Sequence, residues 1–453
     1  MKTPILSSRK SLGKWLAISL GAWLGASLAG GALATDLPAA LRAALATDPT
    51  LASAAANRDA AVENIAIARA RLRPQITLQN TTQYVDQTTI RSIGTTDFNG
   101  QSRSTQLTVR QGLYRPRDRV GLEIGKLQAD YGESQLVAAQ SDLWNRTSAA
   151  WVDVITAQAQ RDVFAGTVAS VARSAEQEKR RFAAGDGTRD AVAEALAQLA
   201  QARSQLSEAK LDLDARVKAF NLLTGLDVKS LDGYGLPSID PGLIVGSETE
   251  LLERALDSNP HVASARVAES IARQRVEQAS ADHWPTVDLI ASMVRAQNDS
   301  ANTLDSRYRN AQIGFQLVVP IYAGGGVNAA QRQASASYAA ASADAEALIQ
   351  RLKTQFISDW NAQDGLRGRA LAAQELVKAA REQRLATELG IRAGVRTWAD
   401  LGSVELVLSR RESDFVNALG SYLKTQARVL SLLPADDPAW TQWSAELSHR
   451  SRR

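Results

Sequence analysis

Apolar residues recur every seven positions along two separate stretches of the chain. Because 3.5 residues per turn keep one face of a helix on its partner, such a stripe held over four heptads predicts a coiled-coil seam. Each residue of the second stripe lies 209 positions after its counterpart in the first, which indicates a duplicated long-helix architecture. The stripes comprise Val192, Leu199, Leu206, Leu213 and Phe220, then Leu401, Leu408, Phe415, Tyr422 and Val429.

The residues before and within the first stripe predict one structural repeat. Pro74 closes a helical stretch, because proline cannot continue a helix. Period-two alternation then predicts strands with one apolar and one polar face. A stretch without proline follows, long enough for a rod of roughly 100 Å. The predicted elements are helices over 36–47 and 50–73, strands over about 74–86 and 103–115 around a polar loop over 88–102, a long helix over 117–181 and a helix over 188–223.

The same order recurs after a segment rich in glycine and proline. Pro260 and Pro285 lie 211 positions after Pro49 and Pro74, and Gly394 lies 209 after Gly185. The second repeat is expected to hold strands over about 285–296 and 309–321 and a rod that ends near 391. The predicted divisions are a signal peptide over 1–34, a first repeat over 35–225, a linker over 226–247, a second repeat over 248–433 and a loose C-terminal tail over 434–453.

The first 34 residues have the pattern of a secretory signal peptide. Lysines and arginines precede an apolar stretch, and Ala32-Leu33-Ala34 fits the small-x-small cleavage rule. The alternative is a membrane anchor, but the apolar core is short and no stop-transfer pattern follows. No later run reaches ~18 apolar residues.

Composition argues against catalysis and against several kinds of partner. The chain has no cysteine, which excludes disulfides, thiolate zinc sites, catalytic thiols and a lipid-modified N-terminal cysteine. None of its three histidines has a second histidine at metal-ligand spacing, so no metal or cofactor is expected. Gly324-Gly325-Gly326 lacks the following G-K-[ST] of a phosphate loop. A net charge of +4 without a polybasic block does not favour nucleic acid. We therefore expect a protein that is not an enzyme.

Four amphipathic strands cannot close a barrel alone, and open sheet edges cannot face lipid. Three copies would supply the twelve strands of a membrane barrel. The alternative is a hairpin of a soluble sandwich, in which apolar and polar residues would alternate in the same way. The signal peptide and the long rods favour the outer membrane. Trp284 is expected either in an interfacial aromatic belt or in a packed junction.

The helix lengths make a further prediction about the rods. The two shorter helices of each repeat together nearly equal its long helix, so they could form a second column beside it. Three chains would then give twelve columns around a lumen. The expected fold is mainly α with a membrane β-barrel: a duplicated helix-strand-strand-long helix-helix unit whose trimer forms a twelve-stranded β-barrel and a twelve-helix α-barrel tunnel.

Three short motifs stand at the two hairpin tips and at the second strand-to-helix exit: Arg181-Phe182-x-x-Gly185, Gly394-x-Arg396-Thr397-x-x-Asp400-Leu401 and Pro320-Ile321-Tyr322-x-Gly324-Gly325. With these motifs, the order of elements resembles the TolC family of outer-membrane efflux and secretion channels. The resemblance spans about 36–433, and the first-half strand exit over 113–116 departs from the usual glycine pair.

The resemblance implies a homotrimer in the outer membrane of a Gram-negative bacterium, with its tunnel in the periplasm. It also implies a periplasmic adaptor and an inner-membrane ABC or proton-driven transporter as partners. The protein would be a passive conduit for secreted proteins or small molecules. The missing lipid-modified cysteine slightly favours type I secretion.

The resemblance also implies a periplasmic gate on the second hairpin. Arg396 and Asp400 match two of the four gate residues, while Ile391 and Ser403 stand where a tyrosine and an aspartate are usual. One Asp400 per chain would give a ring of three negative charges, which matters most in a narrow, low-dielectric constriction. The alternative is that both residues are solvated turn residues. The expected adaptor-contact or turn residues are Gly185, Asp186, Arg189, Asp190, Gly394 and Thr397.

A second class of function stays open on the sequence alone. A periplasmic or cell-surface coiled-coil protein, with hairpins that only cap the rods, would show the same stripes and no channel activity.

Overall fold

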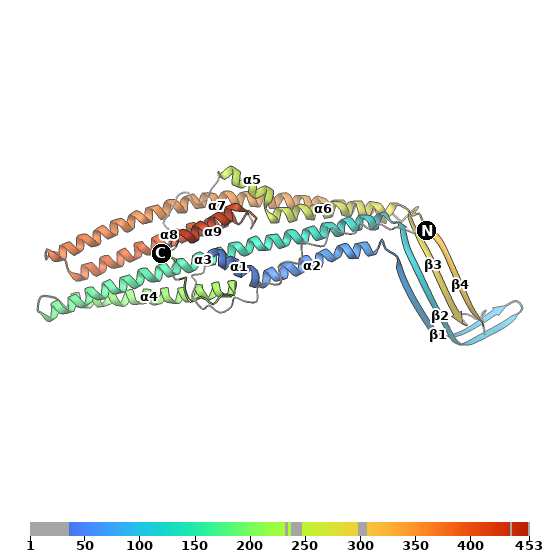
Figure 1. Ribbon diagram of the computed structural model, residues 1–453, viewed down its shortest axis with the longest axis horizontal. Coiled ribbons are helices and arrows are strands. Elements are labelled where there is room, and N and C mark those ends of the chain that lie inside the picture. The colour runs from blue at the N-terminus through green and yellow to red at the C-terminus, as the bar shows by residue number, and fades with distance from the viewer. Residues whose placement is uncertain (1–35, 232–233, 237–246, 298–305, 435–436, 452–453) are drawn as a thin grey trace, which may run out of the picture.

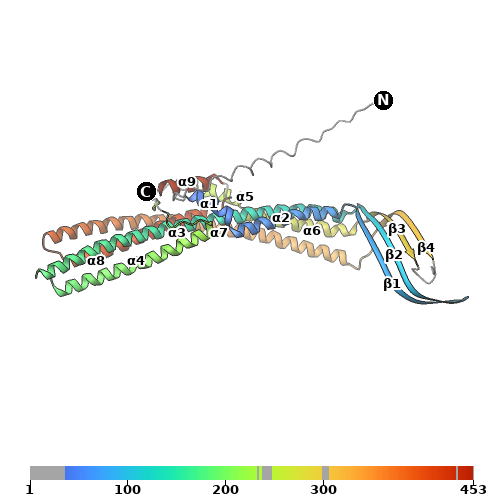
Figure 2. The ribbon, with the colours of Figure 1, turned by 60° about the horizontal axis from the view of Figure 1, so that its bottom comes forward.

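The computed structural model describes residues 36–231, 234–236, 247–297, 306–434 and 437–451. The predicted signal peptide and much of the predicted linker lie outside these residues. The described chain forms a long slab of helices with one antiparallel sheet at its end (Figures 1 and 2).

Both repeats follow one order of elements. The first consists of α1 (Leu37–Thr47), α2 (Pro49–Ala70), β1 (Gln75–Arg91), β2 (Gly94–Tyr114), α3 (Pro116–Ala183) and α4 (Arg189–Thr224). The second consists of α5 (Glu248–Ser258), α6 (Pro260–Ser280), the 3-10 turn η1 (Ala281–His283), β3 (Thr286–Gln297), β4 (Arg307–Val318), α7 (Gly326–Arg392) and α8 (Trp398–Leu430), and α9 (Pro438–Arg450) follows. No helix in these described ranges combines the length and the apolar character needed to cross a bilayer.

The helices form four parallel columns. α3 is 68 residues long and α7 is 67, so each extends roughly 100 Å. α2 and α4 both pack on α3, along its two halves, and α6 and α8 pack in the same way between α3 and α7 (Figure 1). This is the predicted pairing of two short helices with one long one. Most residues of the two seven-step stripes, among them Leu199, Phe220, Leu401 and Tyr422, are buried against neighbouring helices.

The two halves of each short column meet at a capped proline. Asp48 caps α2 by accepting a hydrogen bond from the Leu51 amide at 2.9 Å. Asn259 caps α6 in the same way, and its side-chain amide also donates to the Leu432 carbonyl, just past the end of α8, at 2.8 Å. Proline fits the first helical position because that amide needs no partner. The repeated Asp-Pro and Asn-Pro therefore mark where one short helix succeeds another along the column.

The sheet has the strand order β1-β2-β3-β4, and all its neighbours are antiparallel. β1 and β2 are longer than predicted, because the expected polar loop over 88–102 is wrong. Gln75 pairs with Arg110, and the register continues to Arg91 opposite Gly94, so only two residues form the turn. Four threonines and two isoleucines in 88–102 are β-branched and suit a pleated strand better than a loop.

The two strand-to-helix exits are built differently. In the second repeat Gly324 and Gly325 adopt positive φ angles of 60° and 79°, which favour glycine. In the first repeat Arg115 replaces them. Its guanidinium donates to the buried carboxylate of Asp288 on β3 at 2.7 Å, and Arg110 donates to the same group. An ion pair between the repeats therefore fixes the exit that lacks a glycine pair.

The main core lies halfway along the slab, where α1, α5 and α9 pack on the rods. The expectation of a loose C-terminal tail is wrong, because α9 buries Trp440, Trp443 and Leu447. The ring of Trp440 meets that of Trp144 edge-on at 5.7 Å. Asp437 caps α9 and pairs with an arginine of α5. The sequence held this signal: a cap-proline pair precedes apolar residues spaced three and four apart.

Candidate functional site at the helical tips

The two hairpin tips have the same backbone hydrogen bonds. Gly185 and Gly394 adopt φ angles of 85° and 75° at the ends of α3 and α7. The amide of Asp186 then donates to the Arg181 carbonyl at 3.0 Å, and the corresponding bond in the second tip measures 2.9 Å. A glycine in the left-handed conformation turns the chain so that the amides at and after it can donate to the last carbonyls of the helix. The backbone geometry of the turn therefore explains both glycines.

Each tip continues into a threonine-capped helix. Thr188 caps α4 by accepting from the Ala191 amide at 3.2 Å, and Thr397 caps α8 by accepting from the Asp400 amide at 3.0 Å. In the second tip the bond is reciprocal, because the Asp400 carboxylate accepts from the Thr397 amide at 2.8 Å. This capping box engages one carboxylate oxygen of Asp400.

The structure does not bring the other predicted residues together. Arg396 is exposed and lies over Gly390 of α7, where a Cβ would meet its Cγ at 2.7 Å. Within the described ranges it forms no ion pair with Asp400. Asp186, Arg189 and Asp190 are all exposed at the first tip. They are accessible to a partner, and none is built into a polar cluster.

A carboxylate that sequence reasoning missed joins the two hairpins. Glu178 lies on α3, is 1% exposed and accepts from the amides of Trp398 and Ala399 at 2.7 and 3.2 Å. These amides open α8, where the helix dipole favours negative charge. Arg181 approaches the same oxygen at 3.7 Å. The first hairpin thus caps a helix of the second.

A second link between the hairpins lies beside the first, at Ala399 and Ser403. Gln198 of α4 donates to the Ala399 carbonyl at 3.3 Å and to the Ser403 hydroxyl at 2.9 Å. Gly402 permits this approach, because a Cβ there would lie 2.1 Å from the Gln198 side-chain oxygen. Ser403, at the position where the resemblance expects an aspartate, therefore has a partner on the first hairpin.

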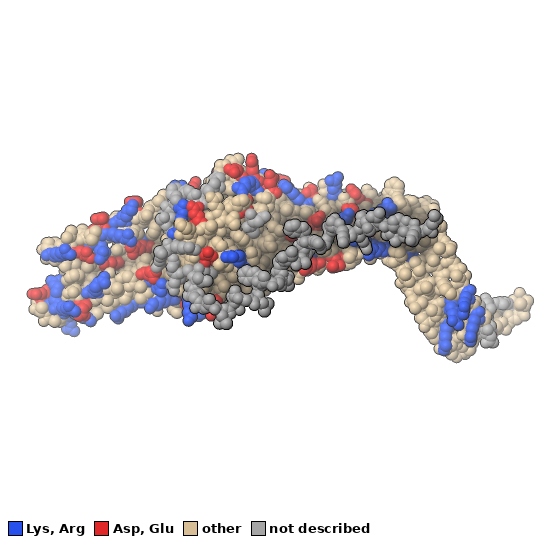
Figure 3. Space-filling model, in the orientation of Figure 1, with Lys and Arg blue, Asp and Glu red and all other residues tan. Residues whose placement is uncertain are grey.

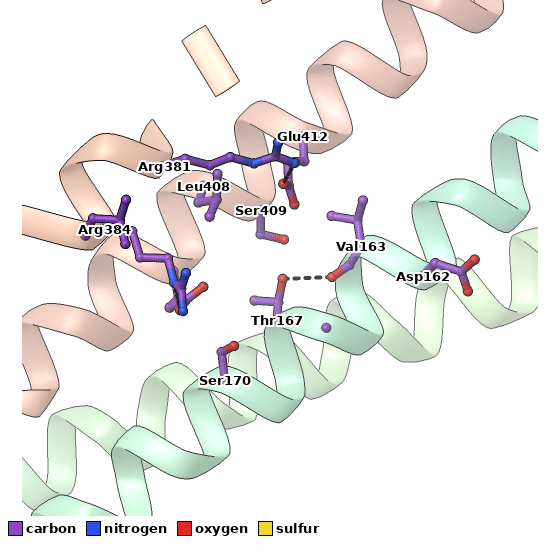
Figure 4. Close-up of a pocket in the computed structure, with 12 residues that line it drawn as sticks. Asp162, Val163, Thr167, Ser170, Arg381, Arg384, Leu408, Ser409 and Glu412 are labelled. Atoms are coloured by element: carbon purple, nitrogen blue, oxygen red, sulfur yellow. Dashed lines mark hydrogen bonds and ion pairs between the residues drawn. The ribbon is translucent and has the colours of Figure 1, made fainter. Parts of the chain in front are cut away.

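A cavity of about 490 Å³ lies between α3 and the hairpin of α7 and α8, between the tips and the middle of the slab (Figure 4). Two ion pairs on its far wall stay within the second hairpin: Arg384 to Glu405 at 2.6 Å, and Arg381 to Glu412 at 2.7 Å. The hydrogen bond from Arg384 to Glu405 raises the pKa of Arg384, against the effect of its burial. On α3 the cavity is lined by Asp162, Val163, Gly166, Thr167 and Ser170.

The second hairpin is therefore cross-linked within itself and meets α3 across a hollow in this stretch. On the tip side of the hollow, Glu178 and Gln198 supply its polar links to the first hairpin. On the other side, Asn417 and Lys424 of α8 bond Gln160 and Asp153 of α3. Such an arrangement lets one hairpin swing from the other if the tip contacts break.

Comparison with known proteins covers most of the chain. The model of a family described as outer membrane efflux protein matches residues 40–226 and 251–434. The outer membrane protein TolC of Vibrio cholerae is 29% identical over 379 residues, covering 83% of this chain and 85% of its own length. The alkaline protease secretion protein AprF of Pseudomonas aeruginosa is 29% identical over 392 residues, covering 85% and 82%. The crystal structure of VceC from Vibrio cholerae shares the fold, with a TM-score of 0.74 at 18% identity over 88% of this chain and 97% of that one.

Proposed function

The chain belongs to the family of outer membrane efflux proteins, and from that premise we propose that three copies assemble into one export channel. The protein is an outer-membrane component of a tripartite export system in a Gram-negative bacterium. Its mainly helical fold with a small antiparallel sheet is that of the family's channels.

The observation that carries the trimer is a sheet with both edges open. β1 and β4 each have one neighbour within the described chain. One face of the sheet carries large exposed apolar side chains, such as Ile76 and Phe315, which are 70% and 75% exposed. A sheet in lipid must close on itself, because bare edges would leave amides and carbonyls without partners. Three sheets of four strands satisfy this condition with twelve strands.

The helices continue the barrel as a tunnel. Four columns per chain give twelve in the trimer, too many for their side chains to fill the centre. The tunnel would extend roughly 100 Å from the sheet, the length of α3. We place the sheet in the outer membrane and the tips in the periplasm.

The tips would hold the gate and the partner contacts. The links from Glu178 and Gln198 keep the second hairpin against the first, and Asp400 and Arg396 lie at its end. Three copies of Asp400 would form an acidic ring. The exposed Asp186, Arg189 and Asp190 of the first tip, with the turns at Gly185, Gly394 and Thr397, would face the periplasmic adaptor.

Planar-bilayer recording of the purified mature protein tests the channel. We expect discrete conductance steps from a species that cross-links as a trimer. A monomeric protein that is soluble without detergent and electrically silent would refute the channel and favour a structural coiled-coil protein.

For cargo we favour a secreted protein delivered through an adaptor and an ABC transporter, because one relative is named for alkaline protease secretion. The test replaces AprF in a Pseudomonas aeruginosa strain that lacks it and measures extracellular protease. Restored secretion supports this cargo class. A chain that forms pores, reaches the outer membrane and restores only drug tolerance in an efflux-deficient strain would indicate small-molecule efflux with a proton-driven pump.

A further inference from the structure

Four arginines gather on one face of the sheet, at its end away from the helices. Arg295 of β3 pairs directly with Arg309 of β4, and Gln297 lies between Arg103 of β2 and Arg307 of β4. Directly paired residues, and residues two apart on one strand, point to the same side. All four arginines are exposed, and basic side chains stand out at this end of the sheet in Figure 3.

The face that carries these arginines is the apolar one. Ile313, Phe315 and Leu317 have the same parity on β4 as Arg309, and they are 64–75% exposed. Met293 has the same parity on β3 as Arg295. If the sheet spans the outer membrane as proposed above, this face meets lipid, and the opposite face, with Gln312 and Gln316, meets the lumen.

The position of the arginines along the strand coincides with a membrane boundary. Eight residues separate Leu317 from Arg309, or roughly 27 Å along the strand. At the usual tilt of a barrel strand this is about 20 Å along the membrane normal, close to the apolar band of such barrels. Trp284 and Tyr322, which are 58% and 86% exposed, lie near the other end of the sheet. An arginine at the bilayer centre would be strongly unfavourable, so the cluster belongs at the outer interface.

The residues that the structure describes, which leave out 298–305, give the cluster no acidic partner. Within the described residues none of the four arginines forms an ion pair, and Arg103 donates only to Gln101, at 2.6 Å. The acidic residues nearest along the same face of the described β1–β2 hairpin are Asp86, opposite Asn99, and Asp97. They lie roughly 14 and 20 Å from Arg103 along the strand. Like charges paired across a sheet are destabilising, which favours an external anion as the counter-charge.

We propose that this cluster binds the phosphate groups of a phosphorylated glycolipid in the outer leaflet of the membrane. Guanidinium groups bind phosphate in a bidentate manner. The four arginines span two strand spacings, about 10 Å, enough for more than one phosphate. The acyl chains would lie on the apolar band directly beside them. The assignment rests on the proposed outer-membrane orientation of the sheet, and the trimer would carry three such sites.

The test measures lipid binding to the delipidated trimer in detergent. The lipids are bis-phosphorylated lipid A, the same lipid A without phosphates, and phosphatidylglycerol. We expect lipid A with phosphates to bind at least about tenfold more tightly than the other two, and its affinity to fall as salt increases. Equal affinities, or an affinity that does not change with salt, would overturn the proposal. Inorganic phosphate at 10 mM should leave the lipid bound; displacement by it would show a free-phosphate site instead.

Substitutions locate the site. R295Q/R307Q/R309Q should weaken binding of phosphorylated lipid A by roughly a hundredfold, at about fivefold per arginine near a charged surface. R69Q/R266Q/R332Q removes the same charge from exposed positions on the helices and should change nothing. Equal effects of the two triple variants would refute the assignment. If the first does not assemble, R295K/R307K/R309K should retain part of the affinity, and the salt dependence of the native trimer still decides.

Conductance separates this proposal from the channel itself. R295Q/R307Q/R309Q should form pores with the native conductance, because these arginines face lipid. A native protein without pores would refute the channel, whatever its lipid binding.

Discussion

Removing the Glu178 carboxylate should release the second hairpin from the first. Glu178 is 1% exposed and accepts from two amides at the start of α8, at 2.7 and 3.2 Å. Hydrogen bonds to a charged acceptor contribute roughly 1.5–3 kcal/mol each, and water recovers part of this at a helix tip. We therefore expect Glu178→Ala to cost about 2–4 kcal/mol of the tip contact. That corresponds to roughly a thirty- to thousandfold rise in the ratio of separated to joined tips.

The measurement uses the absence of cysteine in the chain. Ala184→Cys and Ala393→Cys place one spin label at the exposed end of each hairpin, and pulsed electron paramagnetic resonance gives their distance distribution. In the native background we expect one narrow distribution, and in Glu178→Ala a broad one shifted to longer distances. Glu178→Gln should lie between them, because its amide oxygen still accepts but the charge at the helix N-terminus is lost.

Glu176→Ala is the matched control. Glu176 lies on the same helix, is 55% exposed and pairs only with Arg180 of the next turn. Its removal should leave the distance distribution unchanged. If Glu178→Ala and Glu176→Ala give the same distribution as the native tips, and circular dichroism shows intact helices, the buried carboxylate does not hold the hairpins together.

Three further predictions concern other contacts. Asn259→Ala should lower the free energy of unfolding by about 2–4 kcal/mol, because it removes a cap and the donor to the Leu432 carbonyl. Asn259→Ser keeps the cap and should lose less in urea denaturation; equal losses would exclude a role for the cap. His261 donates to the Asp142 carboxylate, and this interaction raises the pKa of His261, so their attraction is fully present below about pH 6.5 and is lost as pH rises through the raised value. His261→Gln should therefore lower the free energy of unfolding more at pH 5.5 than at pH 8.5, by under about 1 kcal/mol because His261 is half-exposed and Asp142 is exposed. A loss that grows with pH would contradict the pair. Asp400→Asn should raise single-channel conductance or weaken cation block at unchanged melting temperature, since the asparagine side-chain oxygen can still accept from the Thr397 amide; unchanged conductance removes Asp400 from the gate.

Features that depend on neighbouring residues were predictable from the sequence. Gly185 and Gly394 end their helices through left-handed turns, and Thr188 and Thr397 begin the next ones, as the local pattern indicates. The four-column packing followed from helix lengths alone. The errors were also local: α9 had a cap and an apolar stripe, beginning with Trp440, that were overlooked.

Contacts between the repeats were not predictable in this way. Glu178 lies 220 positions before Trp398, and Arg115 lies 173 before Asp288. Glu178 sits in a helix, Asp288 in a strand and Arg115 between β2 and α3, and at each place a solvated side chain would give the same local pattern. What sets them apart is burial, which only the packed structure provides, and a single sequence carries no trace of a partner so distant.

The duplication is broken where the two hairpins meet, and this break argues for different roles of the two tips. The residue 209 positions after Glu178 is Thr387, whose hydroxyl donates within its own helix to Gln383. The residue 209 after Gln198 is Val407, which is 44% exposed. The first hairpin therefore holds the start of α8, while the second has no such carboxylate for the start of α4. The amides that open α4 rely on Thr188 alone among the described contacts, beside exposed charged residues. A tip held by contacts within the same chain can move between a joined and a separated state. A tip without such contacts is accessible to a partner. We accordingly assign the gate to the second hairpin and the adaptor contact mainly to the first.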